Sequence, residues 1–243
     1  MFKRKHFFWS SIATACLGVA VVGILAYGLG APTSTLLGPA LVRGRFIAGG
    51  PREVALTFDD GPSVPYTGQV LDILRKNHVH ATFFLCGANA ELHPELVRRI
   101  MAEGHEVGNH TYSHPWLYLM DRQKIADEID RTQDVLEKIS GRRPRLFRPP
   151  FGVRWFSLWP ILQERGLTMV LWSMRGYDGK LGASAIALTT LAQLQPGGII
   201  LLHDGFETRR AVDVDRSATV RALPSIISGI RRAGYSFVLI PRA

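Results

Sequence analysis

Short apolar runs alternate with amphipathic stretches along the chain after residue 50. Runs rich in Val, Ile, Leu and Phe predict buried strands, and apolar residues at helical spacing predict helices between them. The predicted strands span Val54–Phe58, Ala81–Leu85, Glu106–Asn109, Leu146–Arg148, Thr168–Trp172, Ile199–Leu202 and Phe237–Ile240. The predicted helices span Tyr66–Asn77, His93–Glu103, Asp121–Ser140, Leu158–Arg165, Ala183–Gln193 and Ala218–Ala233. Because such alternation is typical of parallel strands with crossover helices, the pattern predicts an α/β fold.

The number of predicted elements favours a closed arrangement of the strands. About seven parallel strands with helices between them indicate a distorted (β/α) barrel more than an open sheet. In a barrel the reactive groups gather where strands end and loops begin. The polar residues that directly follow the predicted strands are therefore the candidates for chemistry.

Residues 1–30 differ from the rest of the chain. Met1–His6 carries three cations and no acidic residue, and no formal charge occurs from Phe7 to Gly30. As a helix rising about 1.5 Å per residue, this run spans roughly 36 Å, enough to cross a bilayer. We expect residues 1–30 to form a cytoplasmic basic stub and one transmembrane signal anchor, with the rest of the chain outside the cytoplasm. A cleaved signal peptide, which would make the protein secreted, and a lipid-modified Cys16 are the alternatives.

Composition and charge narrow the class of protein. Residues 31–50 are rich in Gly, Pro and small residues and predict a linker that leads into one domain at 51–243. Hydrophobic residues make up 47% of the chain, which excludes a disordered protein, and two cysteines exclude a disulfide scaffold.

The formal charge of +9 comes from scattered residues without a binding motif, so we expect no nucleic acid, and nothing predicts a protein partner. The cluster Arg142-Arg143-Pro144-Arg145 is expected near the functional site, where it could attract an anionic group of a glycan.

Two carboxylates and two histidines follow predicted strands. Asp59 and Asp60 end the first strand and precede Gly61-Pro62, although an aspartate that caps a turn explains this sequence as well. His110 and His114 follow the third strand, and on a helix this spacing brings both rings to one side. Two histidines and one carboxylate form a common catalytic zinc site, in which Asp59 or Asp60 would supply the carboxylate. A pair of solvated loop histidines is the alternative.

Two further candidates also follow strands. Arg148 precedes Pro149-Pro150-Phe151-Gly152, and an arginine keeps its charge and can hold a carboxylate with two hydrogen bonds. His203 ends the most apolar predicted strand. Taken alone, each has a simpler explanation: a surface arginine before a turn, and a histidine with satisfied hydrogen bonds at a strand terminus.

Taken together, the motifs resemble a known family. TFDDGP, H-x-x-x-H, RPPFG and LLHD, in this order, are similar to the motifs of the polysaccharide deacetylases, which are carbohydrate esterase family 4 with the NodB homology domain. The resemblance covers about residues 50–243. It implies a distorted (β/α) barrel and a divalent metal, usually zinc, with cobalt or other ions also accepted. The implied metal ligands are Asp60, His110 and His114.

The resemblance also implies the catalytic residues. Asp59 matches the catalytic base, and Arg148 matches the arginine that pairs with that base. His203 matches the general acid. The backbone N–H of Phe151 matches a donor that stabilises the oxyanion.

One stretch departs from the family pattern. Where the family has an Asp-x-x-Asp-Trp type segment, this chain has Arg175 in place of the first aspartate and Gly179 in place of the tryptophan. A cation beside His203 would lower the pKa of that histidine and weaken it as an acid. We therefore expect Asp178 to be the partner of His203 and Arg175 to point elsewhere. The missing tryptophan leaves the width of the pocket and the preferred acyl group open.

These expectations combine into one function. We expect a metal-dependent hydrolase that removes N-acetyl groups from amino sugars of an envelope or extracellular polysaccharide, such as peptidoglycan, a chitin-like polymer or poly-N-acetylglucosamine. The bond cleaved is a linear amide other than a peptide bond. The expected partners are this polysaccharide or its oligosaccharides, and a membrane through the N-terminal helix. The alternatives are a deacylase of a lipid-linked sugar at the membrane surface and a non-catalytic glycan-binding protein.

Overall fold

The structure is a computed structural model that describes residues 18, 23, 37–44, 49–206 and 215–240. Within these residues, no helix combines the length and the apolar composition that a membrane crossing needs. The predicted transmembrane segment lies outside the described residues, apart from Gly18 and Gly23. The predicted boundaries at residues 30 and 50 therefore stay predictions.

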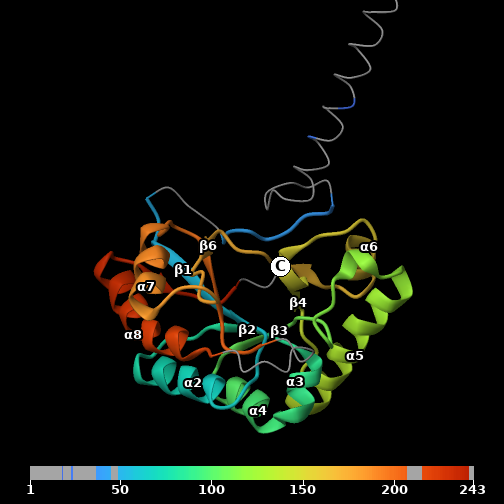
Figure 1. The fold of residues 1–243 in the computed structure, drawn as a ribbon, viewed down its shortest axis with the longest axis horizontal. Coiled ribbons are helices and arrows are strands. Elements are labelled where there is room, and N and C mark those ends of the chain that lie inside the picture. Colours follow the sequence, from blue (N-terminus) through green and yellow to red (C-terminus); the bar gives the residue numbers. More distant parts are fainter. Residues whose placement is uncertain (1–17, 19–22, 24–36, 45–48, 207–214, 241–243) are drawn as a thin grey trace, which may run out of the picture.

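In the described part of the chain, eight short strands form one curled sheet, and the pairings between these strands are all parallel. Their order is β5-β4-β3-β2-β1-β7-β6, and β8 pairs with the start of β1. This arrangement confirms the predicted α/β fold with strands curled into a distorted barrel (Figure 1). The strands are β1 Glu53–Asp59, β2 Thr82–Leu85, β3 Glu106–Asn109, β4 Leu146–Phe147, β5 Thr168–Met169, β6 Met174–Arg175, β7 Gly198–His203 and β8 Ser236–Phe237.

Helices surround the strands in an arc that runs from α7 and α8 past α2, α4 and α3 to α5 and α6 (Figure 1). The longest, α5, begins where the Asp121 side chain accepts a hydrogen bond from the Lys124 N–H at 2.9 Å, and it ends at Gly141 with a left-handed φ of 70°. The helices are α2 Tyr66–Lys76, α3 Gly87–Leu92, α4 Pro94–Ala102, α5 Arg122–Ser140, α6 Leu158–Glu164, α7 Ala183–Ala192 and α8 Ser217–Arg232, with short 3₁₀ turns at Leu117–Leu119 and Pro150–Gly152.

The two longest of the described strands, β1 and β7, are buried along almost their whole length. Parallel strands that are covered on both faces need apolar side chains at nearly every position, which is why these two segments are continuous apolar runs. Side chains of β1, β2 and β7 pack against those of the helices outside them. The resulting core includes Val54, Leu56, Phe58, Val70, Leu74, Phe83, Leu85, Ile100, Ile200, Leu202, Ile226 and Ile230.

The segment at residues 41–44 connects two distant parts of the sheet. The Leu41 N–H donates to the carbonyl of Met169 at 2.8 Å, and the Leu41 carbonyl accepts from the Leu171 N–H at 2.9 Å. The Gly44 N–H donates to the carbonyl of Gly197 at 2.7 Å, just before β7. The backbone N–H of Leu171, just after β5, is therefore paired with this segment. For this reason β5 does not continue as a longer strand.

Two predicted strand boundaries were wrong, and one helix was not predicted. The predicted strand Thr168–Trp172 is only β5, and a separate strand, β6, pairs with β7 after it. The predicted strand Phe237–Ile240 is limited to β8, which pairs only with the start of β1. The helix α3 was missed because its sequence, GANAEL, has too few large apolar residues to show a helical period.

Candidate active site

The polar residues that follow the strands meet at one edge of the sheet. Asp59 is the last residue of β1 and lies opposite His203, the last residue of β7. The strands β3 and β4 pair through their last residues, so His110 and Arg148, which come next, lie at the same level. All these strands run in the same direction, and their carboxyl ends therefore face one common site.

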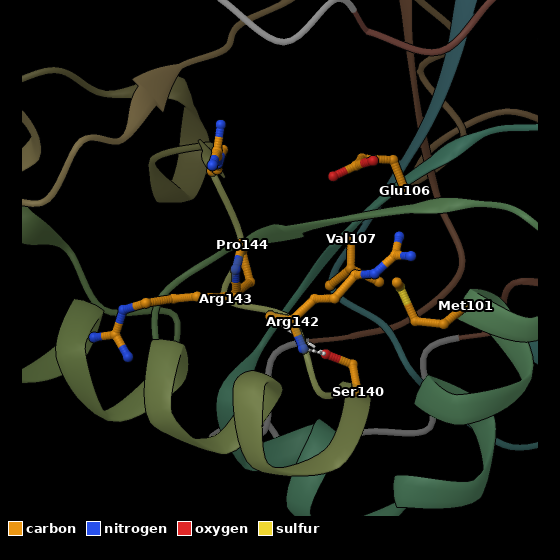
Figure 2. Close-up of a pocket in the computed structure, with 8 residues that line it drawn as sticks. Met101, Glu106, Val107, Ser140, Arg142, Arg143 and Pro144 are labelled. Atoms are coloured by element: carbon orange, nitrogen blue, oxygen red, sulfur yellow. Dashed lines mark hydrogen bonds between the residues drawn. The ribbon is translucent and has the colours of Figure 1, made fainter.

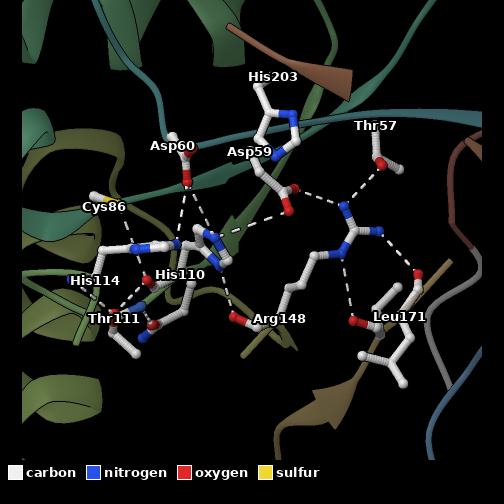
Figure 3. A network of polar contacts seen from close by, with 12 residues as sticks. Thr57, Asp59, Asp60, Cys86, His110, Thr111, His114, Arg148, Leu171 and His203 are labelled. Carbon is white, nitrogen blue, oxygen red and sulfur yellow. Dashed lines mark hydrogen bonds and ion pairs between the residues drawn. The ribbon is translucent and has the colours of Figure 1, made fainter. Parts of the chain in front are cut away.

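Three buried side chains at this edge have the donor atoms of a metal site. The Asp60 Oδ1 atom lies 3.4 Å from His110 Nε2 and 3.3 Å from His114 Nε2 (Figure 3). The three donor atoms lie within 4.8 Å of one another. Asp60 Oδ1 is buried and accepts no hydrogen bond from the described residues. A buried carboxylate oxygen in this position is costly without a cation, so the site fits a divalent metal ion.

A hydrogen bond to the backbone fixes the orientation of the His110 ring. His110 Nδ1 lies 2.7 Å from the backbone carbonyl of Arg148 and donates to it in the matching tautomer. The other ring nitrogen, Nε2, then keeps its lone pair and faces Asp60. An outer hydrogen bond of this kind is usual for histidines that bind metals.

The two histidines reach the site from a loop and not from a helix, so the helical spacing argument was wrong in its geometry. Thr111 and His114 have left-handed φ angles of 68° and 54°. The loop is held by Glu128 of α5, whose carboxylate accepts from the N–H groups of Tyr112 and Ser113 at 2.9 and 2.8 Å. Glu128 was not predicted from the sequence, because a charged residue on a charged helix gives no signal of this role.

Left-handed backbone angles are concentrated at the site. Non-glycine residues rarely adopt them, and they persist where the surrounding structure imposes them, often at functional sites. Among the described residues, only His78 has such an angle elsewhere. The others are Asp60 at 73°, Thr111 at 68°, His114 at 54°, Phe151 at 58° and Tyr177 at 54°.

The pKa shifts of Asp60 and His114 suit metal ligands, whereas the carboxylates of Asp59 and Asp60 outweigh burial and raise the pKa of His110. Burial opposes ionisation of Asp60, but the close approach of His110 and the nearby His203 and His114 hold the pKa of this carboxyl well below its usual range. Burial lowers the pKa of His114 to about 3, with a further contribution from His110. At neutral pH Asp60 is therefore an anion and His114 a neutral ring, which are the forms that bind a metal.

The second aspartate, Asp59, is held by a fully buried arginine. Arg148 Nη1 donates to Asp59 Oδ1 at 2.6 Å and to Thr57 Oγ1 at 2.8 Å, and Nη2 donates to the carbonyl of Leu171 at 3.0 Å. The guanidinium lies 4.0 Å from the centre of the Phe84 ring. Burial lowers the pKa of Arg148, and Asp59 opposes this shift. Every part of the guanidinium is occupied, so it fixes the orientation of the carboxylate.

Asp178 is placed beside His203. Asp178 Oδ1 lies 2.8 Å from His203 Nδ1, and Oδ2 accepts from the His203 backbone N–H at 2.7 Å and from Thr219 Oγ1 at 2.9 Å. Burial lowers the pKa of His203, but Asp178 more than offsets it and raises the pKa to about 9. Arg175 lies elsewhere, with its guanidinium 5.7 Å from the Trp172 ring and 5.3 Å from the Tyr177 ring.

These groups line one cavity of about 410 Å³. Phe151 lies at its wall, with its ring 4.6 Å from that of His114. The aromatic wall is completed by Trp172 and Tyr177. At Gly179, a Cβ atom would meet nothing closer than Arg216 Nη1 at 3.7 Å, so the backbone there has room for a Cβ atom. The cavity is lined by Asp59, Asp60, His110, His114, Phe151, Gly152, Trp172, Arg175, Tyr177, Asp178, Gly179, Lys180, Leu201, His203 and Arg216.

A buried carboxyl next to the site escaped the sequence analysis. Asp204 is fully buried and accepts a hydrogen bond from Thr67 Oγ1 at 2.5 Å. A Cβ atom at Gly61 would lie 2.6 Å from Asp204 Oδ2, so only glycine allows this approach. Burial raises the pKa of Asp204 to about 7, and the charges of Asp60 and Asp59 act in the same direction. The Asp204 carboxyl thus packs against Gly61 in the turn that follows β1.

The arginine cluster lies away from the site, which corrects the sequence prediction. Arg142, Arg143 and Arg145 precede the start of β4, whereas the site follows the ends of the strands. Figure 2 shows the Arg142 side chain beside Val107 of β3 and the Arg143 side chain pointing away from that strand. Arg143 is paired with Asp134 and Glu137 at 3.1 and 2.6 Å. These side chains cannot reach a glycan bound at the metal cluster.

The chain is similar to known proteins in sequence and in fold. The family model described as polysaccharide deacetylase matches residues 47–170. The chain is similar to a peptidoglycan-N-acetylglucosamine deacetylase of Bacillus cereus, with 38% identity over 192 residues, 78% of this chain and 67% of that protein. It is also 38% identical over 199 residues to a chitooligosaccharide deacetylase of Bradyrhizobium, covering 79% of this chain and 91% of that protein. The structure of the peptidoglycan deacetylase PdaC from Bacillus subtilis matches with a TM-score of 0.70 and 35% identity, covering 80% and 90% of the two chains.

Proposed function

Since the chain belongs to the polysaccharide deacetylase family, we propose that it hydrolyses N-acetyl groups of amino sugars in an envelope or extracellular polysaccharide. The observation that carries this proposal is that two adjacent aspartates have different partners. Asp60 lies against the two histidines, and Asp59 is bound to Arg148. One carboxylate is thus available to a metal and the other to a proton. Peptidoglycan and N-acetylglucosamine oligomers, on which the relatives are named, are the first substrates to try.

The metal would be held by Asp60, His110 and His114. A donor set of two imidazoles and one carboxylate suits zinc, and it also accepts cobalt and other divalent ions. A divalent ion bound there supplies a Lewis acid that polarises the acetamido carbonyl and makes water more acidic. The buried, anionic Asp60 and the neutral His114 support this assignment.

Asp59 would act as the general base. Its Oδ1 atom is taken by Arg148, and Oδ2 lies 3.8 Å from His110 Nε2, on the side of the metal cluster. A carboxylate oriented in this way can accept the proton of a water molecule that attacks the carbonyl carbon. The buried guanidinium, 2.6 Å from Asp59 Oδ1, holds the carboxylate in this orientation and stops it from turning away.

His203 would donate a proton to the departing amine nitrogen. An amine is a poor leaving group, so without this proton the tetrahedral intermediate expels water instead. The contact with Asp178 keeps the ring protonated at neutral pH, since the pKa of His203 is raised to about 9. The N–H of Phe151, at the cavity wall, would stabilise the oxyanion of the same intermediate.

Two expectations on location and substrate belong to the same proposal. The basic residues before Phe7 and the uncharged run to Gly30 support a membrane anchor with the catalytic domain outside the cytoplasm. Accessibility of the domain to protease added to intact cells tests this location. Protection from the protease in intact cells, with cleavage after lysis, would contradict it.

The substrate is tested by mass spectrometry of the products. We expect the full chain to convert N-acetylglucosamine oligomers or peptidoglycan fragments into products that lack one or more acetyl groups and carry free amines. Asp59→Asn is the matched variant, because it keeps the size of the side chain. Removal of acetyl groups only from a lipid-linked sugar would replace the polysaccharide with that substrate.

A further inference from the structure

A patch of aromatic side chains lies on the surface formed by the segments that follow β3 and β4. The centres of the Trp116 and Tyr118 rings are 5.7 Å apart, and those of the Trp155 and Phe156 rings are 5.4 Å apart. The two pairs meet where Tyr118 lies 6.2 Å from Trp155. We call these four residues, together with the neighbouring Leu119, the aromatic patch.

The patch is apolar although much of it faces solvent. Leu119 is 72% exposed and Phe156 is 54% exposed, and residues 115–120 and 155–163 carry no formal charge. Four of the eight large apolar side chains that are exposed in the described part of the chain belong to it. A contiguous exposed apolar surface of this kind marks a contact with a partner or with a membrane. Tryptophan and tyrosine are favoured where water meets lipid, because their rings are apolar and carry one polar group.

The chain enters the catalytic domain beside this patch. Leu37 is buried, and a Cβ atom at Gly38 would lie only 2.5 Å from Cγ of Trp159, so the entering backbone lies against the start of α6. Figure 1 shows the entering segment next to α6. Trp159 follows Phe156 by three residues, which is at most about 11 Å of backbone. The entry point and the aromatic patch therefore share one side of the domain.

The tether between this entry point and the uncharged N-terminal run is short. Six residues, 31–36, separate Gly30 from Leu37. Even a fully extended chain, at roughly 3.6 Å per residue, holds Leu37 within about 25 Å of the end of that run. If the run crosses a bilayer, the domain stays at the membrane surface, and the side that carries the entry point is the side nearest to the lipid.

We propose that the aromatic patch docks on the surface of the lipid bilayer that holds the N-terminal anchor. This inference rests on the anchor in the proposed function, and it adds which face of the domain meets the lipid. The rings and Leu119 would enter the boundary between headgroups and acyl chains by about 5–10 Å. Phe151, which lines the catalytic cavity, stacks on Trp116 with ring centres 3.6 Å apart. Docking would therefore hold the cavity beside the headgroups of the same membrane.

Two leucines of similar exposure test which face meets the lipid. Leu119 lies in the patch, whereas Leu92, 69% exposed, ends α3, which lies across the molecule from the entering segment (Figure 1). Leu119→Cys and Leu92→Cys are each made in the full chain with Cys16→Ser, since Cys86 is buried, and labelled with a polarity-sensitive fluorophore. The chains are reconstituted in vesicles of phosphatidylethanolamine and phosphatidylglycerol that contain nitroxide-labelled lipid. Quenching of the label at position 119 should exceed that at position 92 at least about threefold.

A charge placed in the patch should weaken the docking. Phe156→Asp brings a carboxylate to the lipid boundary, where a charge is unfavourable, and should lower the quenching at position 119 by about twofold or more. Phe156→Leu keeps the side chain apolar and should retain the quenching of the parent chain. Equal quenching in both variants would contradict a contact of Phe156 with the lipid.

Acetate release from soluble N-acetylglucosamine oligomers separates this inference from the proposed function. Equal quenching at positions 119 and 92 in an anchored chain that releases acetate would overturn the docking and leave the function standing. A chain that releases acetate but does not partition into the vesicles would overturn the anchor and the docking together. Stronger quenching at position 119 without acetate release would support the docking and refute only the reaction. Slower acetate release by Phe156→Asp, with the quenching at position 119 unchanged, would assign the patch to the sugar chain and overturn the docking.

Discussion

Asp178 accepts two hydrogen bonds from His203, one from the ring at 2.8 Å and one from the backbone N–H at 2.7 Å. The backbone bond holds the carboxylate in place whatever the charge of the ring. The hydrogen bond from the ring is strongest when the imidazole is protonated. Asp178 therefore favours the protonated form of His203 next to the cavity.

Loss of this carboxylate should move the pH dependence of the reaction. In Asp178→Asn burial still lowers the pKa of His203, but the charge that raised it to about 9 is gone. Because His203 acts as an acid, activity is lost as pH rises through its pKa, so the alkaline limb should move to lower pH. At neutral pH we expect kcat to fall on the order of 10- to 100-fold. Asp127→Asn, on the exposed side of α5, is the control, and an unchanged profile in Asp178→Asn would refute the pairing.

Asp59 and Arg148 should respond differently to substitution, although they form one ion pair. Asp59→Asn removes the base and should lower kcat by about 10²- to 10⁴-fold, while Arg148 keeps its contacts to Thr57 and Leu171. Arg148→Ala leaves a buried carboxylate without its partner and should cost about 3–5 kcal/mol of unfolding free energy. Urea denaturation beside steady-state kinetics measures both. An Arg148→Ala chain as stable as the parent would contradict the account of the buried pair.

The two histidines should control metal affinity. Substitution of His110 or His114 by Ala removes one of three donors, and we expect at least a 100-fold loss of zinc affinity, beyond the loss known for outer hydrogen-bond partners. Titration calorimetry of the metal-stripped chain with zinc measures this without turnover. His80→Ala, at an exposed position remote from the cluster, should bind zinc as the parent does. Equal affinity in all three variants would exclude this cluster as the metal site.

Asp204 should make the metal-free chain less stable as pH rises. The pKa of Asp204 is raised from an ordinary 3.8 to about 7 by burial, so the folded chain binds a proton that the unfolded chain has released. The stabilisation is complete below about pH 4 and is lost as pH rises to about 7, in total up to about 4 kcal/mol. In Asp204→Asn this fall in the free energy of unfolding with rising pH should be absent. Urea denaturation with chelator across this range measures it, and the same slope in both chains would show that Asp204 ionises normally.

The sequence predicted the parallel α/β fold because buried parallel strands leave a direct signature. The apolar runs of β1 and β7 are visible as such, and the polar residues after them had to meet at one edge. The motifs around Asp59, Asp60, His110, His114, Arg148 and His203 could therefore be placed together before the structure was known.

Other parts of the site depend on long-range contacts that no local pattern shows. Glu128 holds the histidine loop from the middle of α5, and its neighbours in sequence look like any exposed helix. The same holds for Thr67, which donates to Asp204 across 137 positions of sequence.

The most direct measurement of the central claim is acetate release from N-acetylglucosamine oligomers by the full chain, before and after metal removal. The account predicts that stripping with a chelator abolishes acetate release, that added zinc or cobalt restores it, and that Asp59→Asn binds the metal but releases almost none. Undiminished acetate release by the stripped chain would contradict the metal site of Asp60, His110 and His114. Full activity of metal-loaded Asp59→Asn would contradict the proposed roles of the two aspartates.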